Sequence, residues 1–241
     1  MPVTIRDHPD SHRERPADMV NFSVDDKNLS APEGTSLLQA CLDNGIYIPN
    51  LCYLPDDDHP PASCRLCMVD LSGAPAPVPA CTVPVTEGLV AYTGTERVRR
   101  LQRSALKLLL SNHRVECARC SANKHCALQQ IAKFLKVGLK RGKLADLVQE
   151  PGKKEKEHPY LKYHPARCVL CGKCVRICSR MHPRPLLFFA GRGLCTHINF
   201  FGADENTAAF CSSCFACVDI CPVGALEKRL DSAESTGDEE T

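Results

Sequence analysis

The chain is organised around the stretch His113-Arg-Val-Glu-Cys117-Ala-Arg-Cys120-Ser-Ala-Asn-Lys-His-Cys126, which offers one leading imidazole and three thiols. Sets of four nitrogen and sulfur ligands at such spacing hold zinc or iron–sulfur clusters. The stretch by itself does not separate these two possibilities. The cysteines on either side of it provide the distinction.

Composition indicates a metal-rich chain. It has 241 residues, of which 17 are cysteine, and a formal net charge of +2. The cysteine number is odd and CxxC steps dominate, which argues against a disulfide framework. Residues 1–18 form a polar extension without the apolar segment of a signal peptide, and no apolar run approaches the ~20 residues that cross a bilayer. We therefore expect a cytoplasmic protein, and the small net charge gives no indication of nucleic-acid binding.

Upstream of the central stretch, residues 19–95 predict strand, strand, helix, cysteine loop and further strands, which is the order of a β-grasp domain. The helix is expected over residues 36–44, with Cys41 on its apolar face as a buried small side chain. The spacing Cys52-x11-Cys64-x2-Cys67-x13-Cys81 suits a [2Fe–2S] cluster with two sulfurs on each iron. A four-cysteine zinc ribbon is the alternative. Zinc ribbons usually present two CxxC pairs, however, whereas Cys52 and Cys81 stand alone.

Residues 96–137 predict two helices around the central stretch. Val98, Leu101, Ala105, Leu108 and Leu109 recur at helical spacing, so a helix over residues 95–111 would deliver His113 directly. The second helix follows Cys126. His125, beside Cys126, competes with His113 as the histidine ligand.

Downstream, residues 165–226 contain the most specific signal, two copies of the motif C-x2-C-x2-C-x3-C. In two-cluster ferredoxins the fourth cysteine of each copy binds the other cluster. The copies therefore predict one [4Fe–4S] cluster on Cys168, Cys171, Cys174 and Cys221, and another on Cys178, Cys211, Cys214 and Cys217.

The remaining segments carry weaker signals. Residues 138–164 are a basic connector, interpreted as a solvated loop, with a docking surface for an acidic partner as the alternative. Residues 227–241 are an acidic tail that we expect to be disordered. Cys195 lies between the two ferredoxin motifs and belongs to neither.

These motifs resemble the N-terminal part of the large iron–sulfur subunit of NADH dehydrogenases (respiratory complex I). They also resemble the short diaphorase iron–sulfur subunit of NAD-reducing hydrogenases and formate dehydrogenases. The segment "PNLCYLPDDDHPPASCRLCMVDLSG…VPACTVPVTEG" matches the [2Fe–2S] domain of that family, and His-x3-Cys-x2-Cys-x5-Cys matches its mixed histidine–cysteine [4Fe–4S] signature. The resemblance implies that His113, Cys117, Cys120 and Cys126 bind the third [4Fe–4S] cluster.

The sequence thus predicts an α+β protein with a β-grasp [2Fe–2S] domain, a helical histidine-ligated [4Fe–4S] segment and a two-cluster ferredoxin-like domain. We expect one [2Fe–2S] and three [4Fe–4S] clusters and no catalytic residue. The resemblance implies partners, namely an FMN-containing NAD(P)H-dehydrogenase subunit and a catalytic hydrogenase, formate dehydrogenase or other reductase subunit. The alternatives are a free-standing polyferredoxin and, more remotely, a zinc-binding interaction module.

Overall fold

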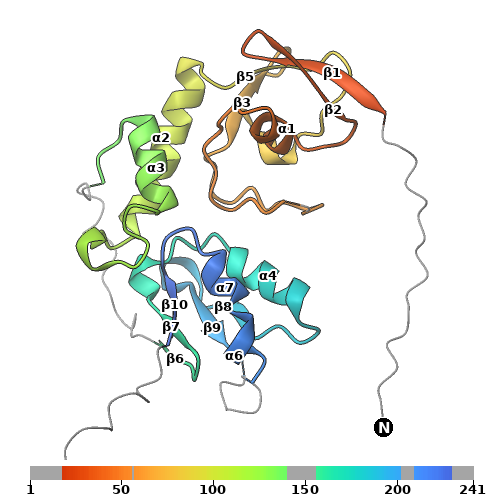
Figure 1. Cartoon of the computed structure of the whole chain (residues 1–241). Coiled ribbons are helices and arrows are strands. Elements are labelled where there is room, and N and C mark those ends of the chain that lie inside the picture. The colour runs from red at the N-terminus through yellow and green to blue at the C-terminus, as the bar shows by residue number, and fades with distance from the viewer. Residues whose placement is uncertain (1–17, 56, 140–155, 202–208, 230–241) are drawn as a thin grey trace, which may run out of the picture.

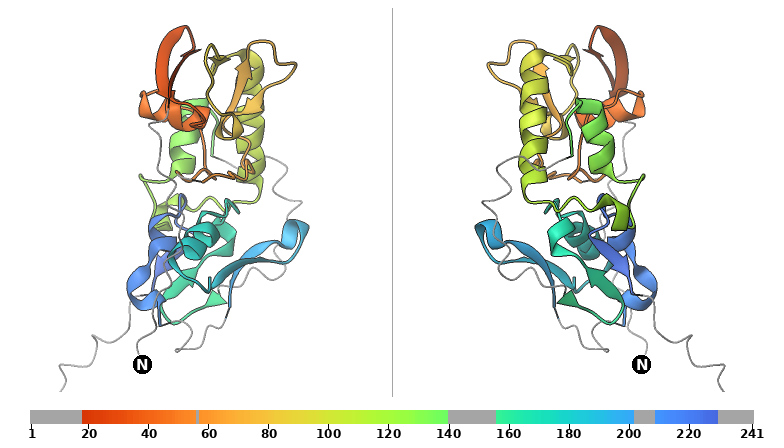
Figure 2. Two further views of the ribbon diagram at one scale, coloured as in Figure 1. Left: turned by 90° about the vertical axis from the view of Figure 1, so that its right-hand side faces the viewer. Right: turned by 90° about the vertical axis from the view of Figure 1, so that its left-hand side faces the viewer.

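The computed structural model describes residues 18–55, 57–139, 156–201 and 209–229 (Figure 1). Almost all of the predicted N-terminal extension, most of the basic connector and most of the acidic tail lie outside the described residues. Two lobes are visible, one above the other, with a pair of helices along one side of them (Figures 1 and 2). Helices and sheets occur in both halves of the chain, so the predicted α+β class is confirmed.

The N-terminal lobe is a mixed five-stranded sheet with one short helix, and its strand order is β2-β1-β5-β3-β4. Strands β1 and β2 form an antiparallel hairpin, while β1 and β5 run parallel. The hairpin turns at Asp25 and Asp26, both with positive φ, as a tight two-residue turn requires. The elements are β1 (Met19–Val24), β2 (Lys27–Pro32), α1 (Leu37–Asp43), β3 (Met68–Leu71), β4 (Val78–Pro79) and β5 (Val90–Tyr92).

Helices α2 (Glu96–Ser111) and α3 (Ala127–Leu135) connect the two lobes. Thr95 caps α2 by accepting a hydrogen bond from the backbone N–H of Val98. The buried face of α2 differs from the predicted one, because Leu106 and Leu110 are buried whereas Leu108 is 64% exposed. Apolar residues occur around much of α2, so the packing of α3 and β3 against it decides which of them are buried.

The C-terminal lobe consists of short elements around the ferredoxin motifs. Its strands are β6 (Lys156–Glu157), β7 (Leu161–Tyr163), β8 (Leu187–Ala190), β9 (His197–Phe200) and β10 (Leu226–Lys228), and its helices are α4 (Lys173–Met181), α6 (Cys211–Cys214) and α7 (Ala216–Asp219). Strands β10, β7 and β6 form one sheet, and β8 pairs with β9.

Two predicted boundaries in this lobe are corrected. The end of the connector forms β6 and β7, where Leu161 and Tyr163 are fully buried, so it is not a solvated loop there. The beginning of the acidic tail forms β10, where Glu227 pairs with Lys162 of β7. In both places two or three residues are too few to show a strand period, and the pairing partner is distant in sequence.

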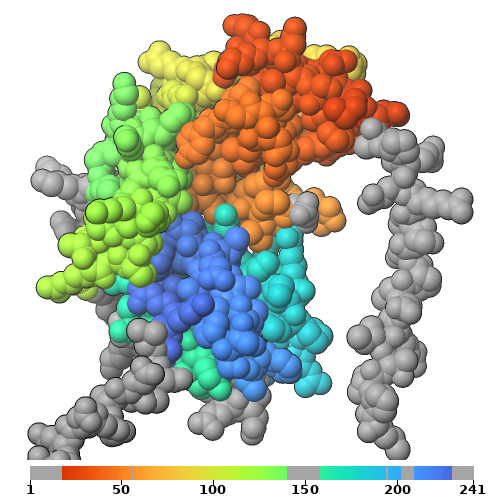
Figure 3. All heavy atoms as spheres, in the orientation of Figure 1, coloured from red at the N-terminus to blue at the C-terminus, as the bar shows by residue number. Residues whose placement is uncertain are grey.

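One continuous core links the lobes. It includes Cys52 and Leu66 from the N-terminal lobe, Leu106 from α2, Leu128 from α3 and Tyr163 from β7. A second core lies within the N-terminal sheet and α1. The loop that carries Cys52 is thus packed against the C-terminal lobe, as the space-filling view also shows for the orange segment near residue 50 (Figure 3). Within the described ranges, no helix has the length and apolar character needed to cross a membrane.

Candidate iron–sulfur centres

The four cysteines of the N-terminal loop are buried and approach one another in two pairs. A hydrogen bond from the Cys64 thiol lowers the pKa of Cys52 to about 5, and the same contact raises the pKa of Cys64. Cys67 and Cys81 form the second pair, in which the pKa of Cys67 is raised and that of Cys81 lowered. Two neighbouring pairs of sulfurs match the donor set of a [2Fe–2S] cluster, which takes two thiolates on each iron.

His113 follows α2 and is 8% exposed. Its Nδ1 lies 2.7 Å from the backbone carbonyl oxygen of Arg167. A carbonyl oxygen only accepts hydrogen bonds, so Nδ1 carries the proton and Nε2 carries the lone pair. This is the usual orientation of a metal-binding histidine, whose second nitrogen is held by a hydrogen bond. His125, the competing residue, is exposed.

The three thiols that follow His113 lie close together. Burial raises the pKa of Cys126, and the nearby Cys120 and Cys117 raise it further. The thiol of Cys120 lies 3.7 Å from the carbonyl oxygen of Val223 in the C-terminal lobe. The backbone N–H of Ala127 donates to the carbonyl of Pro222 at 2.9 Å. The stretch around His113 is therefore attached to the segment that follows Cys221.

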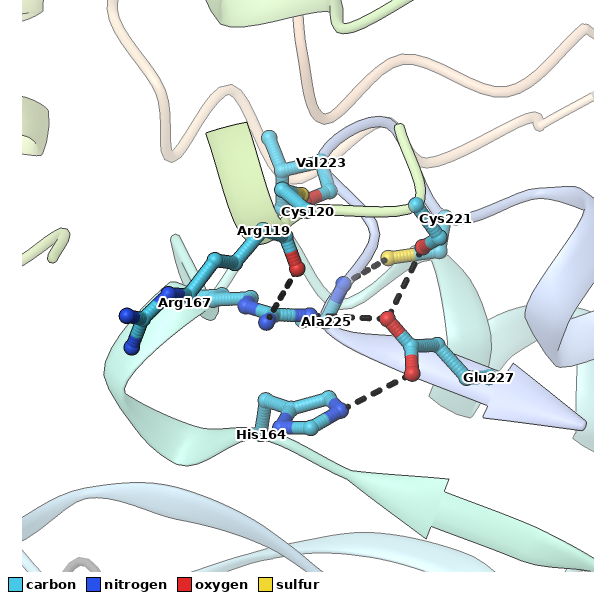
Figure 4. Close-up of polar contacts among 9 residues, drawn as sticks. Arg119, Cys120, His164, Arg167, Cys221, Val223, Ala225 and Glu227 are labelled. Carbon is cyan, nitrogen blue, oxygen red and sulfur yellow. Dashed lines mark hydrogen bonds and ion pairs between the residues drawn. The ribbon is translucent and has the colours of Figure 1, made fainter. Parts of the chain in front are cut away.

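Polar contacts around Glu227 hold this attachment in place (Figure 4). The carboxylate accepts from Arg167 at 2.7 Å, from Ser121 at 2.9 Å and lies 3.0 Å from His164 Nε2. Burial by itself would raise the pKa of Glu227, but these partners lower it overall. Arg167 also donates to the carbonyl of Arg119 at 3.0 Å. One carboxylate thus joins the His113 stretch to β10 and to the turn before Cys168.

The first ferredoxin motif forms an enclosed cavity. All four cysteines predicted for one cluster line it, and they come from positions as distant as Cys168 and Cys221. Burial raises the pKa of Cys171 to about 12, with Cys168 and Cys221 adding to the effect. The hydroxyl of Tyr163 also lines this cavity and forms a hydrogen bond with the Cys168 sulfur, while accepting from the backbone N–H of Ile198 at 3.1 Å.

The second group gathers in the same crossed pattern. Burial raises the pKa of Cys217 to about 12, and the nearby Cys211, Cys178 and Cys214 raise it further. Cys178 of the first motif therefore lies among the thiols of the second motif. The backbone N–H of Leu186 donates to the Cys178 sulfur at 3.3 Å. The thiols are thus arranged as a two-cluster ferredoxin requires, while ligation itself stays a prediction.

Sequence reasoning missed one residue at these sites. His182 Nε2 lies 3.3 Å from the sulfur of Cys214, and the His182 ring packs against Phe210. The only sequence signal is that His182 stands four residues after Cys178. Of the two unassigned cysteines, Cys41 is fully buried, and burial raises its pKa to about 12, whereas Cys195 is exposed.

Three family models match consecutive parts of the chain. Residues 17–96 match a 2Fe-2S iron-sulfur cluster binding domain, and residues 102–141 match the NADH-ubiquinone oxidoreductase-G iron-sulfur binding region. Residues 158–227 match the ferredoxin-like domain of NADH-quinone oxidoreductase subunit 3. Each candidate site lies within one of these matches: Cys52 to Cys81 lie in the first, His113 to Cys126 in the second, and the two ferredoxin motifs in the third.

Several curated proteins are similar over most of this chain. The NADPH-Fe(3+) oxidoreductase subunit alpha of Geobacter sulfurreducens is 32% identical over 209 residues, which cover 86% of this chain and 24% of that protein. The NADH-ubiquinone oxidoreductase 75 kDa subunit of Reclinomonas americana is 31% identical, covering 88% of this chain and 30% of its own length. The NADP-reducing hydrogenase subunit HndD of Solidesulfovibrio fructosivorans is 31% identical, and the match covers 86% of this chain and 36% of that protein. The chain therefore spans roughly a quarter to a third of the length of these relatives.

A solved structure matches at nearly full length. One chain in the crystal structure of a NAD+-reducing [NiFe]-hydrogenase in the H2-reduced state superposes with a TM-score of 0.69 and 28% identity. The match covers 91% of this chain and 90% of that one. Together, these findings show that the chain consists of iron–sulfur binding domains and resembles the iron–sulfur region of the large complex I subunit and a chain of a NAD+-reducing hydrogenase.

Proposed function

We propose that this chain is an electron-transfer subunit with one [2Fe–2S] and three [4Fe–4S] clusters, held by the ligand sets predicted above. The observation that carries the proposal is the enclosed cavity lined by Cys168, Cys171, Cys174 and the distant Cys221. Four convergent thiols in a buried pocket are the donor set of a [4Fe–4S] cluster, and bound clusters of this kind accept and release one electron at a time.

The relay runs between two partners. One is a flavoprotein NAD(P)H-dehydrogenase subunit that carries FMN, and the other is a catalytic hydrogenase, formate dehydrogenase or other reductase subunit. The hydrogenase chain that matches at 90% of its own length supports this assignment. The protein would operate in the cytoplasm, consistent with the absence of a membrane-length helix in the described ranges.

Contacts among the sites favour a central position for the Cys168 site. The Cys52 loop packs into the same core as Cys168. The histidine stretch is joined to this site through His113 and the Arg167 carbonyl. Cys174 lies close enough to Cys217 for the Cys217 thiol to contribute to the raised pKa of Cys174. An electron that reaches the Cys168 site therefore has a neighbour in each of the other three groups.

Metal analysis tests the proposal directly. Anaerobically purified protein should be brown and contain about 14 iron and about 14 acid-labile sulfide atoms per chain, the sum of one [2Fe–2S] and three [4Fe–4S] clusters. A colourless protein with stoichiometric zinc would contradict the cluster assignment.

A second experiment separates a subunit from a free carrier. The chain should co-purify with a co-expressed NAD(P)H-dehydrogenase flavoprotein, and NAD(P)H should bleach the cluster absorbance only when that flavoprotein is present. A chain that stays monomeric and unreduced in the presence of the flavoprotein would favour the polyferredoxin alternative.

A further inference from the structure

Helix α4 holds the loop of Cys52 through Arg176. The guanidinium Nη2 of Arg176 donates a hydrogen bond to the backbone carbonyl oxygen of Cys52, the first predicted ligand of the [2Fe–2S] cluster. The two residues are far apart in sequence and belong to different lobes. Because α4 also carries Cys174 and Cys178, one side chain connects the ligand loop to the helix that serves both ferredoxin-type sites.

Asp57 fixes the direction of that guanidinium. Its Oδ2 lies 3.1 Å from Arg176 Nε, and the two side chains are only 12% and 23% exposed. Both atoms are buried and form no hydrogen bond, so the contact between them is an ion pair. Removing Asp57 would take away the charge that faces Arg176 Nε in this partly buried place. Arg180 adds a weaker contact, 3.9 Å from Asp57 Oδ1, and donates to the carbonyl of Pro55 at 3.1 Å.

The space around the guanidinium leaves it little freedom. Nη1 lies beside Gly172, where an added Cβ would come within 3.7 Å of it and within 3.1 Å of the Phe189 ring. Lys173 is half-buried nearby and lies close enough to Cys171, Cys52 and Cys64 to interact with all three thiols. The ligand loop and the Cys168 site therefore meet at this point of α4.

We infer that Arg176 is a positioning residue that locks the Cys52 loop onto α4 and so fixes the separation between the [2Fe–2S] centre and the Cys168 centre. The inference rests on the cluster assignment proposed above. The planar guanidinium donates from Nη2 to the Cys52 carbonyl while its Nε edge faces the Asp57 carboxylate in an ion pair, and an ammonium group on a flexible stem reproduces this arrangement poorly. The separation matters because electron transfer between the two centres depends on it.

Electron paramagnetic resonance of the dithionite-reduced holoprotein measures the separation. In the wild type, a neighbouring reduced [4Fe–4S] centre should shorten the spin relaxation of the [2Fe–2S] signal. Arg176→Met and Arg176→Lys should both weaken this effect, whereas the control Arg184→Met, at an exposed arginine just after α4, should retain it. Wild-type relaxation in Arg176→Met, or full retention by Arg176→Lys, would overturn the inference.

Proteolysis supplies a readout that does not depend on the clusters' magnetism. Tyr53 is 7% exposed and becomes accessible to chymotrypsin only when the loop opens. Arg176→Met removes a charge-assisted hydrogen bond from the closed state, so the loop should open more often. Cleavage after Tyr53 should therefore become about tenfold faster or more. An unchanged cleavage rate would contradict the locking role.

The variants also distinguish this inference from the proposed function. If Arg176→Met does not assemble the [2Fe–2S] cluster, the milder variant Asp57→Asn tests the inference in its place. Asp57→Asn should weaken the relaxation effect while keeping the iron content. Wild-type relaxation in Asp57→Asn would then overturn the inference. A wild-type protein without iron–sulfur signals would instead refute the cluster assignment itself, and a wild type with signals but no relaxation effect would refute only the fixed separation.

Discussion

Replacing His113 by alanine should remove one [4Fe–4S] cluster and leave the [2Fe–2S] cluster in place. The iron content should fall from about 14 to about 10 atoms per chain, because one of the four clusters loses a ligand. The substitution also removes the 2.7 Å hydrogen bond from Nδ1 to the Arg167 carbonyl, which costs about 1 kcal/mol. That cost is small compared with the ~5–15 kcal/mol stability of a typical folded domain. The protein should therefore still fold, so that a loss of iron reports on ligation.

Metal analysis and electron paramagnetic resonance of the same sample form the assay. His125→Ala is the matched control, because His125 is exposed and stands beside Cys126 in the same stretch. It should keep about 14 iron atoms and all signals. If His113→Ala keeps its full iron content and all three [4Fe–4S] signals, the assignment of His113 as a ligand fails. If His125→Ala loses a cluster, His125 is the ligand instead.

Four other substitutions test the core, the electrostatics and one sulfur contact. Leu106→Ala should lower the free energy of unfolding by about 2–5 kcal/mol, and the exposed Leu108→Ala by less than about 0.5 kcal/mol, in anaerobic guanidinium unfolding. Hydrogen bonds from Arg97 hold the pKa of Asp70 below its ordinary value, so its stabilising effect is present at neutral pH and lost as the pH falls through that lowered pKa. The difference in the free energy of unfolding between wild type and Asp70→Asn, measured by circular dichroism at a series of pH values, should thus be constant from about pH 7 to about pH 5, begin to decline near about pH 4 and vanish only below the lowered pKa of Asp70. Tyr163→Phe removes a hydrogen bond to a ligand sulfur and should lower the midpoint potential of one [4Fe–4S] centre, as measured by a redox titration; an unchanged potential would exclude that role.

Local patterns predicted the elements of the N-terminal half well. The alternation of Val20, Phe22 and Val24 marks β1, and these side chains are buried as the period of two requires. The existence and length of α2 also follow from its sequence. Its buried face does not follow, because leucines occur on several sides and the choice depends on neighbours that are distant in sequence.

Residues at element boundaries were the harder part of the prediction. Tyr163 lies in a stretch with the composition of a charged loop, yet it is fully buried because β10 pairs with β7 and the Cys168 cavity forms around it. Glu227 begins an acidic tail by composition, but its carboxylate binds Arg167 and Ser121. Such roles depend on partners about 60 to about 106 residues away, which no local period records.

The sequence by itself determined which cysteines group together, because the spacings within CxxC motifs are local and each ligand chemistry admits few of them. Only the tertiary structure decided how the groups meet. The contact of Arg176 with the Cys52 carbonyl and Asp57 spans two lobes, and the hydrogen bonds that Glu227 accepts from Arg167 and Ser121 join segments that are distant in sequence. The physical reason is that burial and charge compensation act between residues close in space, whatever their separation along the chain.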